Sequence, residues 1–119
     1  MIKAVILDVD GVIVGDKPGI NFPLPHSDVI QKFKKLHAQG LPIILCTGKF
    51  NFAIQEIIKQ AQLDNPHITD GGALIIDPLN KRIIREHVID RNIVKEAVSL
   101  FLEKNLYTEA YTPQAYYIQ

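Results

Sequence analysis

Three short apolar runs, separated by two helical patterns, restrict the fold of this sequence more than any other feature. The runs are Ile2–Val9, Leu41–Cys46 and His67–Thr69. The first is almost wholly aliphatic, which is typical of a strand buried on both faces in a parallel sheet. The order strand, helix, strand, helix, strand (βαβαβ) therefore predicts an α/β fold. Its core would be a Rossmann-like half-sheet of three parallel strands with right-handed crossovers.

Both helical patterns carry signals for where they begin and end. We expect Ser27 to cap the first helix and Gly40 to end it. We expect Asn51 to cap the second, which the breaker Asp64-Asn65-Pro66 ends. A loop rich in glycine and proline, residues 15–25, precedes the first helix.

The pattern changes after Gly72. Residues 73–77 and 82–88 flank a turn sequence and are expected to form a hairpin. Asp90 is then expected to cap a third helix that ends at Asn105, and Tyr111–Gln119 to form a further strand. We therefore divide the chain into a first part of a parallel core, residues 1–72, and the beginning of an α+β module, residues 73–119.

Polar side chains end all three predicted parallel strands. Asp8 and Asp10 end the first, Thr47 and Lys49 follow the second, and Asp70 follows the third. Ligands of open α/β sheets bind outside the carboxyl ends of the strands, so these groups are expected to share one crevice. Paired carboxylates are natural ligands for Mg²⁺. One carboxylate can also attack phosphorus while a second serves as general acid and base.

Each of these features also has a purely structural explanation. An aspartate or a Thr-Gly pair at a strand end commonly forms a turn, and a lysine there is usually solvated. Asp70-Gly71-Gly72 is most simply a turn as well. A functional site is favoured because independent polar signals fall at the ends of all three strands.

Composition excludes several classes of function. Lys+Arg and Asp+Glu are 13 each, so the formal charge cancels and nucleic acid is not the expected partner. No apolar run has membrane-spanning length, and no signal-peptide cleavage site follows Met1. The one cysteine, Cys46, excludes an internal disulfide and favours the reducing cytoplasm.

Two segments resemble motifs of the haloacid dehalogenase superfamily. Asp8-Val9-Asp10-Gly11-Val12, after an apolar strand, resembles the first motif, and Ile43–Lys49 resembles the second. The segment His67–Ile75 is similar to the asparagine-glycine-alanine stretch that enters the large cap of Cof-type sugar phosphatases. The following hairpin, helix and strand resemble the start of that cap. The resemblance spans nearly the whole chain but only the N-terminal half of the family's pattern.

The resemblance implies a Mg²⁺-dependent phosphohydrolase of small phosphorylated metabolites that works through an aspartyl-phosphate. In that scheme Asp8 is the nucleophile and a metal ligand. Asp10 is the general acid and base, and its backbone carbonyl binds the metal. Thr47 and Gly48 hold the phosphoryl group, while Lys49 and Asp70 are candidates on the substrate side.

The sequence also departs from the family's pattern. Lys49 stands where the family usually has arginine, and Asp70 replaces the usual asparagine. The family's third-motif lysine and fourth-motif acidic ligands lie beyond the cap, outside these 119 residues. We therefore expect a truncated, inactive chain, either part of a longer phosphatase or self-associated through an open sheet edge.

Two alternatives stay open. One is a non-catalytic fragment or interaction module that keeps the half-fold without activity. The other is a signalling receiver domain, which also uses acidic groups and Mg²⁺ at strand ends. A receiver requires five successive βα units, which the predicted hairpin interrupts.

Overall fold

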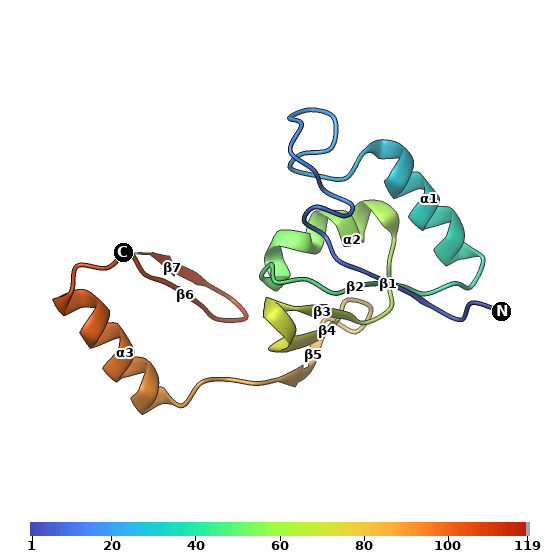
Figure 1. Cartoon of the computed structure of the whole chain (residues 1–119). Coiled ribbons are helices and arrows are strands. Elements are labelled where there is room, and N and C mark those ends of the chain that lie inside the picture. The colour runs from blue at the N-terminus through green and yellow to red at the C-terminus, as the bar shows by residue number, and fades with distance from the viewer. Residues whose placement is uncertain (119) are drawn as a thin grey trace. The chain divides into compact units, whose positions relative to one another are not determined.

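The computed structural model describes residues 1–118 and divides into two compact units. The first unit runs from Met1 to Glu86, and the second begins at His87. Figure 1 shows the first unit in blue to yellow and the second in orange to red. Each unit is described by itself.

The first unit contains the predicted parallel strands. β1 (Val5–Leu7) pairs in parallel with β2 (Ile43–Leu45), and Leu7 lies opposite Leu45. β3 (His67–Thr69) joins β2 through a parallel bridge between Cys46 and Ile68. The predicted α/β fold with parallel strands is confirmed, although regular pairing in β1 and β2 covers fewer residues than their apolar runs.

Two further strands continue this sheet beyond β3, and each runs antiparallel to its neighbour. β4 (Leu74–Asp77) is antiparallel to β3, and β5 (Arg82–Glu86) is antiparallel to β4. The predicted hairpin is therefore present, and it continues the sheet that contains β3. The predicted boundary at Gly72 concerns core and cap and stays a prediction, whereas the compact units divide after Glu86.

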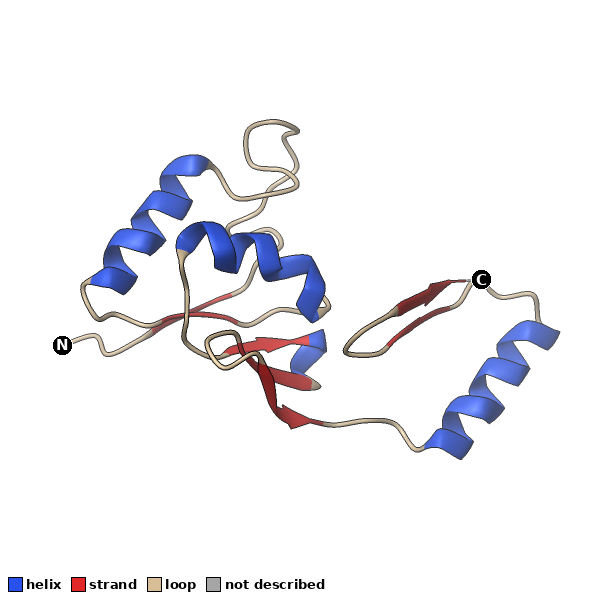
Figure 2. Cartoon of the chain, turned by 180° about the vertical axis from the view of Figure 1, so that it is seen from behind, coloured by secondary structure: helices blue, strands red, loops and turns tan. Residues whose placement is uncertain are grey.

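The helices of this unit cover one face of its sheet. α1 (Ser27–Ala38) and α2 (Gln55–Ala61) lie on the same side of the strands, and a short 3₁₀ helix, η1 (Asn51–Ile54), leads into α2 (Figures 1 and 2). Their buried side chains join those of the strands in one core: Val9, Val14, Ile30, Phe33, Ile43, Leu45, Ile54, Ile57, Ile58, Ala61, Leu63, Leu74 and Ile76.

Burial of β1 on both faces is not observed. Ile6 is 62% exposed and Ile2 is 74% exposed, while Val9 is fully buried. Within the described residues, β1 has a strand partner only on its β2 side. The apolar run therefore predicted the strand correctly, but it overestimated how much of the strand the rest of the chain buries.

Both predicted caps of the first two helices are wrong. His26 caps α1, because its Nδ1 accepts from the Asp28 N–H at 3.2 Å, and Ser27 is already helical. Asn51 is the first residue of η1, and its own N–H donates to Asp70. At the start of each helix, the backbone N–H is thus bound by a side chain other than the one that local preference favours. The acceptor is the His26 imidazole at α1 and the Asp70 carboxylate at η1.

The second unit contains α3 (Arg91–Glu103) and a hairpin of β6 (Glu109–Tyr111) and β7 (Tyr116–Ile118). The predicted cap of α3 is confirmed, since Asp90 accepts from the N–H of Asn92 at 2.8 Å. The single strand predicted for Tyr111–Gln119 is wrong. A turn that begins at Thr112 and contains Pro113 divides it, and Gln119 lies outside the described residues. No helix in the described part of the chain is long and apolar enough to cross a membrane.

Candidate active site at the strand ends

The loop after β1 presents two carboxylates to solvent. The carbonyl of the buried Val9 accepts from the N–H groups of Ile13 and Val14 at 3.0 and 2.9 Å, which closes a tight turn. Asp8 and Asp10 flank Val9 and are exposed. Gly11 has φ +72°, a left-handed conformation that most side chains disfavour. The buried Val9 side chain therefore anchors the loop to the core, while the carboxylates of Asp8 and Asp10 stay accessible to solvent.

The end of β2 lies beside that loop. The Cys46 N–H donates to the Leu7 carbonyl at 2.8 Å, which fixes the register of the two strand ends. Thr47 follows and is 5% exposed, while Gly48 is open to solvent. The Thr47 Oγ1 accepts from the Lys49 N–H at 3.1 Å. Because the hydroxyl oxygen is the acceptor in this bond, its hydrogen can still be donated to an anion.

An ion pair joins the first two strand ends. The Lys49 Nζ lies 3.1 Å from the Asp10 Oδ1, with both side chains partly exposed. An exposed pair of this kind contributes little to stability, about 0–1 kcal/mol. Its significance is its position, because it places a cationic group beside the Asp10 carboxylate.

Asp70 lies at the end of β3, but its carboxylate faces the loop after β2. The Oδ2 accepts from the Asn51 N–H at 3.1 Å and from the Thr69 hydroxyl at 2.7 Å. The backbone N–H of Asp70 donates to the Lys49 carbonyl at 2.8 Å. The structure thus links four of the predicted site residues in one connected group: Asp10, Thr47, Lys49 and Asp70. A crevice that they share with Asp8 stays a prediction.

The donor set fits a hard cation in kind, although it is incomplete. The carboxylates of Asp8 and Asp10 are the oxygen ligands that Mg²⁺ prefers. Within residues 1–118, no group of three or more His, Cys, Asp or Glu side chains is placed to hold a metal. Further oxygens would have to come from backbone, water, substrate or additional residues.

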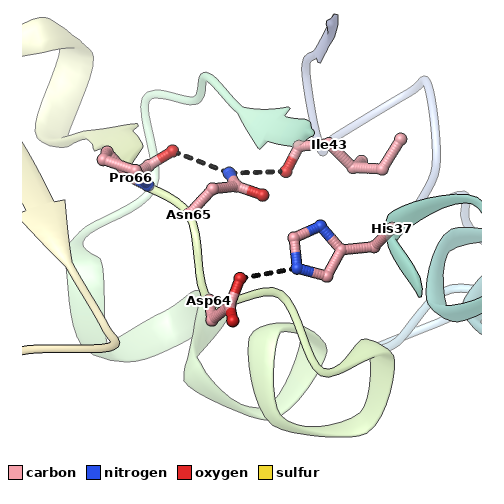
Figure 3. Close-up of polar contacts among 5 residues, drawn as sticks. All are labelled: His37, Ile43, Asp64, Asn65 and Pro66. Atoms are coloured by element: carbon pink, nitrogen blue, oxygen red, sulfur yellow. Dashed lines mark hydrogen bonds and ion pairs between the residues drawn. The ribbon is translucent and has the colours of Figure 1, made fainter. Parts of the chain in front are cut away.

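Two histidines belong to a separate structural cluster. The Nδ1 of the fully buried His67 accepts from the Leu45 N–H at 3.1 Å, and burial lowers the pKa of His67 to about 4. Figure 3 shows the second, His37, with its Nε2 2.6 Å from the Asp64 Oδ1. Beside it, the Asn65 amide donates to the carbonyls of Ile43 and Pro66. His67 begins β3, so this cluster lies at the opposite end of that strand from Asp70.

Comparison with known proteins identifies the family to which this site belongs. The family of haloacid dehalogenase-like hydrolases matches residues 5–119. The chain belongs to this family. The motif at Asp8–Val12 and the strand-end arrangement of this haloacid dehalogenase-like chain agree with that membership.

Curated relatives of this haloacid dehalogenase-like chain are phosphatases. The 5-amino-6-(5-phospho-D-ribitylamino)uracil phosphatase of Bacillus subtilis is 26% identical over 110 residues, which cover 92% of this chain and 36% of the relative. Phosphoglycolate phosphatase 1 of Saccharolobus solfataricus is 23% identical over 111 residues, which cover 93% of this chain and 46% of the relative. The chain therefore spans less than half the length of these relatives.

Solved structures share the fold over the same part. A haloacid dehalogenase-like hydrolase of Bacteroides thetaiotaomicron superposes with a TM-score of 0.85 at 17% identity, covering 99% of this chain and 44% of that one. A HAD/COF-like hydrolase of Plasmodium vivax gives 0.78 at 25% identity, covering 98% and 42%. The resemblance to Cof-type members of the family is thus confirmed, and the chain corresponds to part of a larger fold.

Proposed function

We propose that this chain provides the nucleophile-bearing part of a Mg²⁺-dependent phosphohydrolase of small phosphorylated metabolites. The observation that carries the proposal is the junction of the strand ends, where the Lys49 ammonium contacts Asp10 and the Asp70 backbone contacts Lys49. The names of the two curated phosphatases support a small phosphorylated substrate. The single cysteine favours the cytoplasm.

The proposed reaction has two displacements at phosphorus. A carboxylate oxygen of Asp8 attacks phosphorus, the bond to the leaving oxygen breaks, and the Asp10 carboxyl gives that oxygen a proton. Asp10, now a carboxylate, then takes a proton from water while the water oxygen attacks the aspartyl-phosphate. Inorganic phosphate leaves and both carboxyl groups return to their starting states.

The remaining groups stabilise charge during these displacements. The Thr47 hydroxyl hydrogen and the backbone at Gly48 would bind phosphoryl oxygens, and these bonds would strengthen as charge redistributes in the transition state. Asp8 and the Asp10 backbone carbonyl would hold Mg²⁺, which when bound supplies positive charge against the phosphoryl group. Lys49 adds a cation on the same side, although we do not assign it the role of the family's third-motif lysine.

The direct test measures hydrolysis of p-nitrophenyl phosphate with and without Mg²⁺, by the 119-residue chain and by an active form of the protein. We expect the chain by itself to show little or no turnover, because the lysine and further acidic ligands that the resemblance implies are outside its sequence. In the active form, Asp8→Asn should abolish turnover, since an amide does not attack phosphorus.

The other outcomes are equally informative. Near-normal activity of the Asp8→Asn variant would contradict the nucleophile assignment. Robust Asp8-dependent turnover by the isolated chain would show that this half-site is sufficient. Phosphorylation by acetyl phosphate without turnover would favour a receiver-like domain, and the absence of both reactions would favour a non-catalytic module.

A further inference from the structure

We propose that Asp70 is a positioning residue that holds the Thr47–Asn51 loop in the conformation required for phosphate binding. The inference rests on the proposed function and deepens it, because it assigns a role to the residue that departs from the family's asparagine. Sequence reasoning placed Asp70 on the substrate side of the site. The contacts of its carboxylate and backbone point to the loop instead.

Four hydrogen bonds from β3 and the residues after it fix this loop at alternate residues. The Thr47 N–H donates to the Ile68 carbonyl at 3.1 Å. The Gly71 N–H donates to the Thr47 carbonyl at 3.2 Å, and the Asp70 N–H donates to the Lys49 carbonyl at 2.8 Å. The Asp70 Oδ2 accepts from the Asn51 N–H at 3.1 Å. The loop backbone is therefore tied to β3 and its end at residues 47, 49 and 51, and Asp70 supplies two of the four bonds.

These ties determine what the loop offers to a ligand. With its backbone fixed, Lys49 donates its N–H to the Thr47 Oγ1 and extends its ammonium to Asp10. Both contacts depend on where the Lys49 backbone lies, and that backbone is bonded directly to Asp70. Loss of the carboxylate removes the tie at Asn51 and leaves the residue-70 N–H bonded to the Lys49 carbonyl. It would therefore loosen the end of the loop, which weakens an anion site built on the hydroxyl and the ammonium.

Asp70 is itself held for this task. The Thr69 hydroxyl, on a fully buried residue, donates to the same Oδ2 at 2.7 Å. The backbone of Asp70 has φ +55°, a left-handed conformation that aspartate and asparagine tolerate better than most side chains. Asparagine could therefore keep both the backbone shape and an oxygen acceptor, and it provides the conservative variant.

The test measures amide hydrogen exchange and the binding of inorganic phosphate, and both are monitored by NMR on the full chain. Asp70→Gly removes the carboxylate without straining the left-handed backbone. We expect it to speed exchange of the Asn51 amide about tenfold or more and to weaken phosphate binding about tenfold, as expected for loss of the acceptor that binds the Asn51 N–H. Asp70→Asn should stay within about twofold of the unchanged chain in both measurements, since its amide oxygen can accept the same bonds.

Two additional variants keep the result interpretable. Thr69→Val leaves the residue-70 backbone unchanged and removes only the bond that orients the Oδ2, so it should also speed exchange at Asn51, by a smaller factor. Glu56→Gln, on the exposed side of α2, changes the net charge as Asp70→Asn does and should affect neither measurement.

The outcomes separate this inference from the proposed function. Unchanged exchange at Asn51 in both Asp70→Gly and Thr69→Val would overturn the positioning role. Equal losses in Asp70→Asn and Asp70→Gly would also overturn it, because charge rather than an acceptor would then matter. If the unchanged chain binds no phosphate, the proposed function fails, while exchange at Asn51 still decides whether Asp70 holds the loop.

Discussion

At the scale of single residues, the site depends on which hydrogen-bonding capacity each side chain has already used. The Thr47 oxygen accepts from its own loop, and the Asp70 carboxylate accepts from Asn51 and Thr69. Thr47 therefore keeps a donor for a ligand, whereas Asp70 mainly serves the protein. This difference is why we propose Thr47 as a phosphate-binding residue and Asp70 as a positioning residue, and the residue types alone do not reveal it.

Replacing Thr47 tests the phosphate contact. In an active form of the protein, Thr47→Ala should lower turnover about 100-fold, which is typical for removal of one donor to a developing oxyanion. The loss should be similar for every phosphate ester, because the phosphoryl group is common to all of them. Steady-state kinetics on several esters measures this, with Thr47→Ser as the control that retains the hydroxyl. A loss confined to one substrate would show that Thr47 contacts the leaving group.

At the scale of elements, polar contacts join segments that are far apart in sequence. The His67 Nδ1 accepts from the Leu45 N–H and so links β3 to β2. His37 near the end of α1 contacts Asp64, which follows α2 (Figure 3). These contacts stabilise the packing of the first unit away from the strand-end site.

The link through His67 predicts a pH-dependent stability. Burial lowers the pKa of folded His67 from its ordinary 6.5 to about 4, so the unfolded chain binds the proton more tightly. The contribution of neutral His67 is complete above about pH 6.5. It falls as pH is lowered from 6.5 towards 4, by roughly 3 kcal/mol over that window.

Urea unfolding of the chain at a series of pH values measures this contribution. His67→Asn does not titrate, so its free energy of unfolding should change less between pH 6.5 and 4 than that of the unchanged chain. The comparison uses the slope against pH and therefore tolerates a lower absolute stability of the variant. Identical slopes would show that His67 has the same pKa in the folded and unfolded chain, and so that it is not buried in solution.

At the scale of the whole molecule, the helices of the first unit leave part of its apolar surface exposed. Ile2 and Ile6 are exposed on and beside β1, and the relatives are more than twice as long as the matched segment. An apolar edge strand tends to pair with another chain. We therefore propose that this edge is covered either by further residues of a longer protein or by a second copy of the chain.

Self-association of the 119-residue chain distinguishes the two. If a second copy covers the edge, light scattering should give a mass above that of the monomer, and Ile6→Lys should shift it towards the monomer by placing a charge on β1. Ile20→Lys, at another exposed isoleucine in the loop before α1, should leave the mass unchanged. A monomer at every concentration would exclude the second copy and favour a longer protein.

The sequence by itself determined the order of strands and helices in the first unit, the third helical segment and the position of polar residues after each parallel strand. These features depend on periodic burial and on residues adjacent in sequence, such as Asp90 capping α3. Only the tertiary structure showed that Asp70 caps Asn51, 19 residues away, or that Lys49 reaches Asp10. Such contacts depend on strand register and on competition among acceptors, which a local pattern does not encode. For the same reason the apolar run at Ile2–Val9 indicated a strand, while its neighbours determined that Ile6 stays exposed.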